Sequence, residues 1–275
     1  AGRPALGRVT GVLHGRCGAA PVPAVTRGRG LTRPCLAVLA LLVPVLACDV
    51  APAGEYSPPG LYEVDHRLLD NGLRVILKPR SGAHTVALRV VVGIGQHDYD
   101  CGWQEIPHFL EHLLFTGTSR HSESELDERV ERHGGYWNAY TYAEETVYEL
   151  DIYGRYAMTG LEVLHEIMTD SLLSPADVET SRAIIEREAG GRPSAIQQWM
   201  RRRGVGWSAT DRALRQVLPD SNYVCEELEG VTGITRGHIL EAFREYYVPG
   251  NMALVVVGDF EPAAMHAAIR ATFGR

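Results

Sequence analysis

The sequence has very little lysine, and the part of the chain after residue 48 is not basic. Lys78 is the only lysine among the 275 residues, and the net charge is −7. Residues 1–48 contain six arginines and no acidic residue, so the rest of the chain is more acidic than the total indicates. Contacts to a phosphate backbone need clustered Lys and Arg side chains, which argues against nucleic acid as a partner. The sequence also has no serine nucleophile elbow and no glycine-rich phosphate loop, which argues against those two kinds of site.

The chain near its start has no hydrophobic run of the length that a transmembrane helix needs. The apolar run at residues 35–47 follows Arg33 and has the length of a signal-peptide core. It ends in Val-Leu-Ala-Cys, which resembles a bacterial lipobox and predicts a lipid anchor on Cys48. An ordinary secretory signal and an arginine-rich organellar transit peptide are the alternatives.

We therefore expect residues 1–48 to be a targeting segment and residues 49–61, rich in Pro, Gly and Ser, to be a linker. On this reading the protein is exported and is periplasmic or membrane-anchored, with a mitochondrial location as the alternative.

Cysteines are also few. Cleavage of the targeting segment would remove two of the five, and lipidation would modify Cys48. Cys101 and Cys225 would remain. Two cysteines so far apart in the sequence do not define a disulfide framework. We expect free thiols, with a disulfide between them in an oxidising compartment as the alternative.

Residues 62–275 predict one globular domain of the α+β class. An Asp-Asn-Gly turn within residues 66–79 predicts a hairpin, because Asn-Gly supplies the positive φ angles of a tight turn. Alternating or continuous apolar runs predict further strands in residues 85–95, 136–153 and 251–260. Helical spacing and end signals predict helices after Pro107 and in residues 123–135, 156–173, 174–191, parts of 191–250, and 261–274. This order of elements predicts a mostly antiparallel β-sheet packed against α-helices.

The stretch His-Phe-Leu-Glu-His at residues 108–112 carries the strongest chemical signal. On a helix, His108 and His112 share one face one turn apart, and Glu111 lies beside them. Two imidazoles suit zinc, whose catalytic sites use three protein ligands and a water. Glu111 is then placed to activate a zinc-bound water as general base. A chance match is expected about 0.03 times in a chain of this composition. A metal site therefore explains the pattern better than a polar helix face does.

Four segments resemble the family of inverted-motif zinc peptidases that contains pitrilysin, insulinase and the mitochondrial processing peptidase. They are "LLDNGLRVIL", "PHFLEHLLFTGT", "GGYWNAYTYAEETVYELDIY" and "YYVPGNMALVVVGDF". The resemblance covers nearly all of residues 62–275 in the family's order, and it corresponds to the N-terminal half of the family's subunit.

The resemblance implies a third zinc ligand, a glutamate about seventy-five residues beyond the second histidine. Glu188 lies 76 positions beyond His112 and is the predicted ligand, with Glu186 as the rival. The two point in different directions on a helix, so only one of them can serve. The family often has a second acid one heptad before this ligand, where this chain has Ser181; that departure predicts weakened activity.

The resemblance further implies a zinc-dependent endopeptidase that binds one zinc ion and acts on unfolded peptides or small proteins. Asn138, Ala139 and Tyr140 fall in the family's substrate-binding edge strand. A C-terminal half or a partner subunit is expected to complete the active site. The alternatives are a catalytically weak or inactive structural subunit of such a heteromer, and a metal-binding module without peptidase chemistry.

Overall fold

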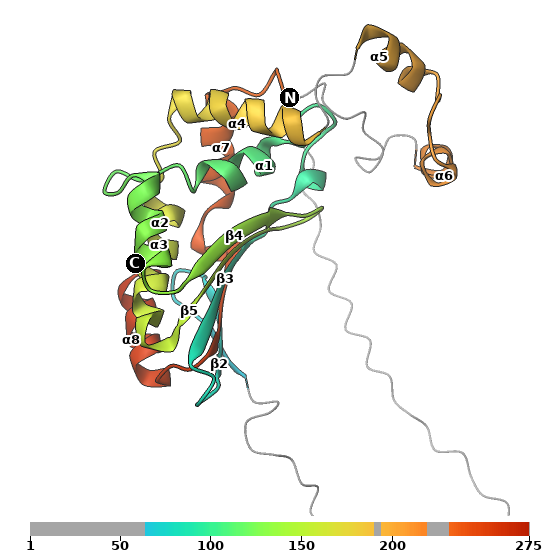
Figure 1. Cartoon of the computed structure of the whole chain (residues 1–275). Helices are drawn as coiled ribbons and strands as arrows, with labels where there is room; N and C mark the ends of the chain where they lie inside the picture. The colour runs from blue at the N-terminus through green and yellow to red at the C-terminus, as the bar shows by residue number, and fades with distance from the viewer. Residues whose placement is uncertain (1–63, 190–193, 219–230, 275) are drawn as a thin grey trace, which may run out of the picture. The chain divides into compact units, whose positions relative to one another are not determined.

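The computed structural model describes residues 64–189, 194–218 and 231–274 (Figure 1). The predicted targeting segment, the lipid anchor at Cys48, the linker and Cys225 lie outside these residues. Across the described part of the chain, no helix has the length and apolar character needed to cross a membrane.

A six-stranded sheet forms the centre of the fold. Its strands are β1 (Asp65–Leu68), β2 (Arg74–Pro79), β3 (Thr85–Val92), β4 (Tyr136–Thr141), β5 (Thr146–Tyr153) and β6 (Met252–Gly258). They lie in the order β1-β2-β6-β3-β5-β4, and every neighbouring pair is antiparallel except β2 and β6. The predicted Asp-Asn-Gly hairpin joins β1 to β2, with Gly72 at φ +90°. The mostly antiparallel sheet of the prediction is confirmed.

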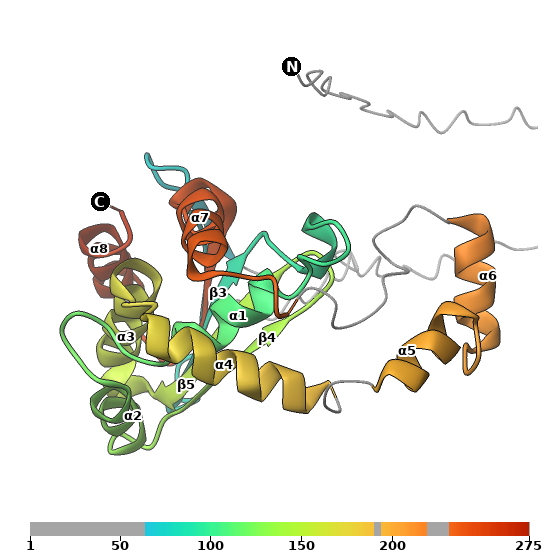
Figure 2. The same ribbon diagram turned by 90° about the horizontal axis from the view of Figure 1, so that it is seen from above.

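Several helices cover one face of this sheet. The helices of the described residues are α1 (Ile106–Leu113), α2 (Glu123–Glu131), α3 (Ala157–Asp170), α4 (Pro175–Glu188), α5 (Ala195–Arg202), α6 (Ala209–Val217), α7 (Arg236–Tyr246) and α8 (Pro262–Ala271). Figures 1 and 2 show α3 and α8 along the sheet and α1, α4 and α7 beside one of its ends. Alternate residues of the central strand β3 are buried, which is the pattern of a sheet with one covered face. The α+β class is therefore confirmed.

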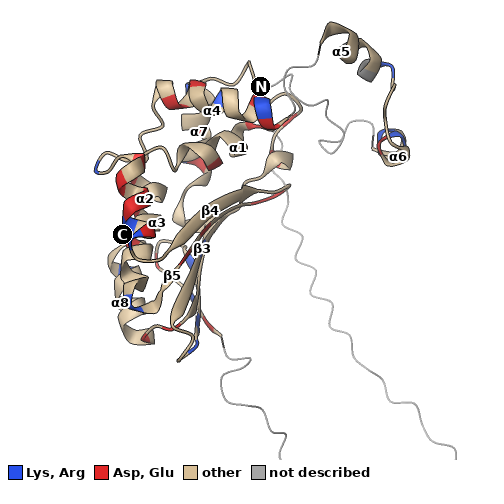
Figure 3. Ribbon diagram, in the orientation of Figure 1, with Lys and Arg blue, Asp and Glu red and all other residues tan. Residues whose placement is uncertain are grey.

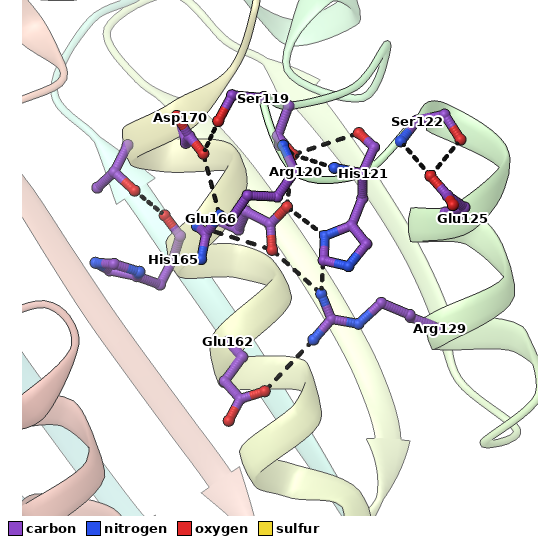
Figure 4. A network of polar contacts seen from close by, with 12 residues as sticks. Ser119, Arg120, His121, Ser122, Glu125, Arg129, Glu162, His165, Glu166 and Asp170 are labelled. Atoms are coloured by element: carbon purple, nitrogen blue, oxygen red, sulfur yellow. Dashed lines mark hydrogen bonds and ion pairs between the residues drawn. The ribbon is translucent and has the colours of Figure 1, made fainter.

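The loop between α1 and α2 is tied to α3 by a network of polar contacts (Figure 4). At its centre is Glu166 of α3, whose side chain is only 3% exposed. Its carboxylate accepts hydrogen bonds from Thr118 Oγ1 at 2.5 Å, His121 Nδ1 at 2.7 Å and Arg129 Nη1 at 3.1 Å. Because Thr118 and His121 belong to the loop that follows α1, the network fixes the path of the chain just beyond the histidine motif.

Two sequence predictions are wrong in detail. Cys101 is disulfide-bonded, not a free thiol, and every other cysteine lies outside the described residues. Spacing along a chain does not report distance in space, so the sequence could not decide whether Cys101 is bonded. The helix predicted for residues 156–173 ends earlier, at Asp170, and Leu172 beyond its end is 52% exposed.

Candidate metal site

The helix α1 presents the histidine motif along one face and a hydrophobic side along the other. Its apolar residues are buried against the core, whereas the side chains of His108 and His112 are 21% and 22% exposed. Pro107 is tolerated because it lies in the first turn, where a backbone N–H has no partner within the helix. The amphipathic pattern therefore turns both imidazoles to the accessible side of a well-anchored helix.

The helix α4 brings the third predicted residue to the same place. Ser174 accepts a hydrogen bond from the backbone N–H of Asp177, and Pro175 begins the helix. Along α4, Arg182 donates to the carbonyl oxygens of Val231 and Ile234. The same guanidinium lies over the ring of Phe109 on α1, with its Cζ 5.2 Å from the ring centroid. These contacts fix the approach of α4 to α1, so Glu188, its last residue, reaches the histidines.

The three side chains converge with the spacing that a zinc ion requires. Nε2 of His108 lies 3.1 Å from Nε2 of His112, and Oε2 of Glu188 lies 3.3 and 3.5 Å from these two nitrogens. A tetrahedral zinc with bonds of about 2.0–2.1 Å needs donor atoms roughly 3.3 Å apart. Among the described residues, this is the one group of three or more His, Cys, Asp or Glu side chains that could hold a metal. The donor set fits zinc, and the rival Glu186 is not part of it.

The surroundings of the two imidazoles shift their pKa values in opposite directions. Burial acts to lower the pKa of His108, but a hydrogen bond to Glu105 and the charges of Glu105, Glu111 and Glu188 outweigh it and raise that pKa. Burial and the neighbouring His108 instead lower the pKa of His112. Figure 3 shows the acidic residues on α1 and near the end of α4 that create this field. These acidic side chains give the site a negative electrostatic potential, which favours the binding of a cation.

The proposed general base lies beside the metal-binding face and contacts the sheet. Oγ1 of Thr141, the last residue of β4, donates a hydrogen bond to Oε2 of Glu111 at 2.5 Å. A charge-assisted hydrogen bond of this length is strong and directional. The carboxylate is thus held from the strand as well as from its own helix. The sequence prediction did not include Thr141, because nothing in the sequence near Thr141 indicates that β4 ends against α1.

The predicted substrate-binding residues lie on an edge strand. Among the described strands, β4 pairs with β5 and with no other, so its second side is an edge. Ala139 is buried toward the helices, Asn138 is half-buried, and Tyr140 is 42% exposed. An exposed edge presents backbone N–H and C=O groups that a further strand can pair with. The structure therefore brings this edge, Glu111 and the convergent ligand set into one region.

Comparison with known proteins gives consistent matches. Residues 74–202 match the family described as insulinase (peptidase family M16), and residues 233–275 match the M16 inactive domain. The beta subunit of a mitochondrial-processing peptidase from Blastocladiella emersonii is 25% identical over 207 residues, covering 75% of this chain and 43% of that protein. A probable zinc protease, PqqL from Haemophilus influenzae, is 27% identical over 238 residues, covering 82% of this chain and 25% of that protein.

A solved structure shows the same fold. The periplasmic protease PqqL from Escherichia coli superposes with a TM-score of 0.64 at 23% identity, covering 79% of this chain and 24% of that one. The chain thus spans less than half the length of these relatives.

Proposed function

Because the chain belongs to the insulinase family of M16 peptidases, we propose that it is the zinc-binding half of a metalloendopeptidase that cleaves unfolded peptides or small proteins. Relatives in this family are named zinc proteases, which implies one zinc ion. One observation carries the proposal: the donor atoms of His108, His112 and Glu188 lie within 4.8 Å of one another. This cluster lies beside Glu111, whose carboxylate contacts β4, and among the described strands β4 is at the edge of the sheet.

In this proposal His108, His112 and Glu188 hold the ion. When bound, zinc supplies a Lewis acid that lowers the pKa of water and polarises a carbonyl. Glu111 accepts the proton of the attacking water and later delivers it to the leaving amine. Because Thr141 donates to Oε2 of Glu111, Oε1 is the atom that we assign to the proton.

The substrate is proposed to pair with β4 as an added strand. Asn138, Ala139 and Tyr140 then contribute through the backbone, and the half-buried and exposed side chains of Asn138 and Tyr140 contact it on the open face of the sheet. Pairing through the backbone selects an extended segment, because a peptide within a folded domain already uses its own hydrogen-bonding groups. This supports unfolded chains as the substrate class.

The remaining parts of the proposal concern the rest of the protein. A C-terminal half or a partner subunit would complete the active site. This arrangement is supported by the relatives, of which the matched part of this chain covers 43% and 25% of the length. Residues 62–275 form the peptidase half, residues 1–48 a targeting segment and residues 49–61 a linker. Relatives are described as periplasmic or mitochondrial. The sequence around Cys48 supports the exported, lipid-anchored form of these alternatives.

The test measures bound zinc and peptide cleavage separately. Wild type, Glu111→Gln, His108→Ala and the exposed control Glu123→Gln are assayed with a quenched fluorescent unfolded peptide, in the presence of the second half. We expect Glu111→Gln to keep zinc and lose at least about a hundredfold in rate. His108→Ala should lose both, and Glu123→Gln neither. Full activity in Glu111→Gln would refute its role as base, and a zinc-free wild type would refute the metal site.

A further inference from the structure

Glu105, the residue just before α1, makes a direct contact with a proposed zinc ligand. Its Oε2 lies 2.8 Å from Nδ1 of His108, and the two side chains are 25% and 21% exposed. An ionised carboxylate can only accept hydrogen bonds, so the imidazole is the donor. Glu105 occupies the N-cap position of α1, yet its carboxylate caps no backbone N–H of the helix. Its side chain is therefore committed to the histidine.

The helical register explains why this contact forms. Glu105, His108 and His112 are spaced i, i+3 and i+7, which places them along one stripe of the helix surface. Ile106 and Leu110, on the side turned to the core, are 3% and 0% exposed and fix the rotation of the helix. The positive end of the helix dipole favours an anion at this position. Glu105 is thus held in place by the same packing that orients the ligands.

The contact determines which nitrogen of His108 is available. With the proton on Nδ1 directed to Glu105, the lone pair of Nε2 points to Nε2 of His112 and Oε2 of Glu188. A carboxylate on the second nitrogen of a metal-binding histidine fixes its tautomer and orientation and increases its basicity. On α4, the position one heptad before Glu188 holds Ser181, a buried neutral side chain that cannot do this. The carboxylate partner of the site therefore comes from the start of α1.

We propose that Glu105 is a positioning residue for the metal site, which holds His108 with Nδ1 protonated and Nε2 directed at the ion. This inference rests on the proposed zinc site. On this proposal Glu105 supplies the acidic side chain that the family often has at the position of Ser181.

The experiment measures the affinity of the purified chain for Zn²⁺ by competition with a chromophoric chelator. The variants are Glu105→Ala, Glu105→Gln and Glu123→Gln, and the last is a matched control because Glu123 is an exposed carboxylate in the first turn of α2. We expect Glu105→Ala to weaken binding about 10- to 100-fold. Glu105→Gln should weaken it less, because the amide oxygen still accepts from Nδ1. Glu123→Gln should stay within about twofold of the wild type.

Further readouts separate positioning from a general loss of structure or charge. The urea midpoint of Glu105→Gln should match that of Glu123→Gln, and the visible spectrum of bound Co²⁺ should change in Glu105→Ala alone. Unchanged zinc affinity in Glu105→Ala would overturn the inference and leave the proposed function standing. Equal losses in both Glu105 variants would overturn it as well, because charge acting at a distance would then account for the affinity. A wild type that binds no zinc would overturn both.

Discussion

Replacing Glu166 by Gln removes a buried charge from the centre of the network in Figure 4. The side chain accepts from Thr118, His121 and Arg129 at 2.5, 2.7 and 3.1 Å. Gln keeps the size but turns an NH2 group toward one of these donors. Hydrogen bonds to charged groups are worth about 1.5–3 kcal/mol, and breaking a buried ion pair costs about 3–5 kcal/mol. Because Arg129 keeps some contact with water, we expect Glu166→Gln to lower the free energy of unfolding by about 2–4 kcal/mol.

Glu162 offers a matched control on the same helix. Its carboxylate also contacts Arg129, at 3.4 Å, but its side chain is 60% exposed. Exposed ion pairs contribute about 0–1 kcal/mol, so Glu162→Gln should change the stability by less than about 1 kcal/mol. Urea unfolding with linear extrapolation measures both variants, and equal m-values would show that the comparison is valid. If the two variants lost the same amount, burial would not be the source of the effect and the reasoning would be refuted.

The same pair of variants tests the pH dependence. Burial acts to raise the pKa of Glu166, but hydrogen bonds from Thr118 and His121 and the charge of Arg120 outweigh it and lower that pKa below its ordinary 4.5. A group with a lowered folded-state pKa stabilises fully above its unfolded value and loses that contribution as the pH falls through the folded value. The stability gap between wild type and Glu166→Gln should therefore be constant above pH 4.5 and shrink below it. A gap that widened on acidification would contradict the assigned direction.

Three further predictions concern the metal, the base and the sheet. Removing zinc with a chelator should abolish peptide cleavage and re-addition should restore it; a rate that survives complete removal, checked by atomic absorption, would exclude zinc catalysis. Thr141→Val loses the hydrogen bond to Glu111, so kcat/KM should fall about tenfold with zinc content unchanged. Gly258→Ala should lower stability by at least about 2 kcal/mol, because φ is +136° and a Cβ would overlap the carbonyl oxygen of Thr85. Gly82→Ala, with φ +81° and open space around it, should cost about half as much in the same unfolding assay.

Local signals in the sequence predict the elements of the fold better than they predict its topology. The hairpin of β1 and β2 follows from Asp-Asn-Gly, and the start of α4 follows from the Ser-Pro pair at Ser174. The place of β6 does not. It inserts between β2 and β3, parallel to one and antiparallel to the other, although almost the whole domain separates it from them in sequence. Pairing between segments this distant depends on the packing of the whole domain, which no local pattern encodes.

The residues of the site also differ in whether local sequence or long-range packing determines their place. The i, i+4 spacing of His108 and His112 is a local property, so the sequence alone indicates a two-ligand face. Glu188 was assigned by resemblance, because its distance from the histidines depends on how α4 packs against α1. Glu105 is not among the predicted site residues, because its contact with Nδ1 of His108 depends on side-chain orientations that the sequence does not encode. Thr141 was missed because its contact with Glu111 depends on β4 ending at α1.

The metal ligands and the strand proposed to hold the substrate lie on different elements. The histidines and Glu188 belong to α1 and α4, which the core and the contacts of Arg182 fix to each other. Glu111 belongs to α1 but is also bonded to the end of β4 through Thr141. A peptide that pairs with β4 therefore acts on the strand that orients the base, without acting directly on the ligands. Peptide binding would then move the carboxylate of Glu111 while the ion stays in place. Substitutions in β4 should therefore change the turnover rate more than they change the affinity for zinc.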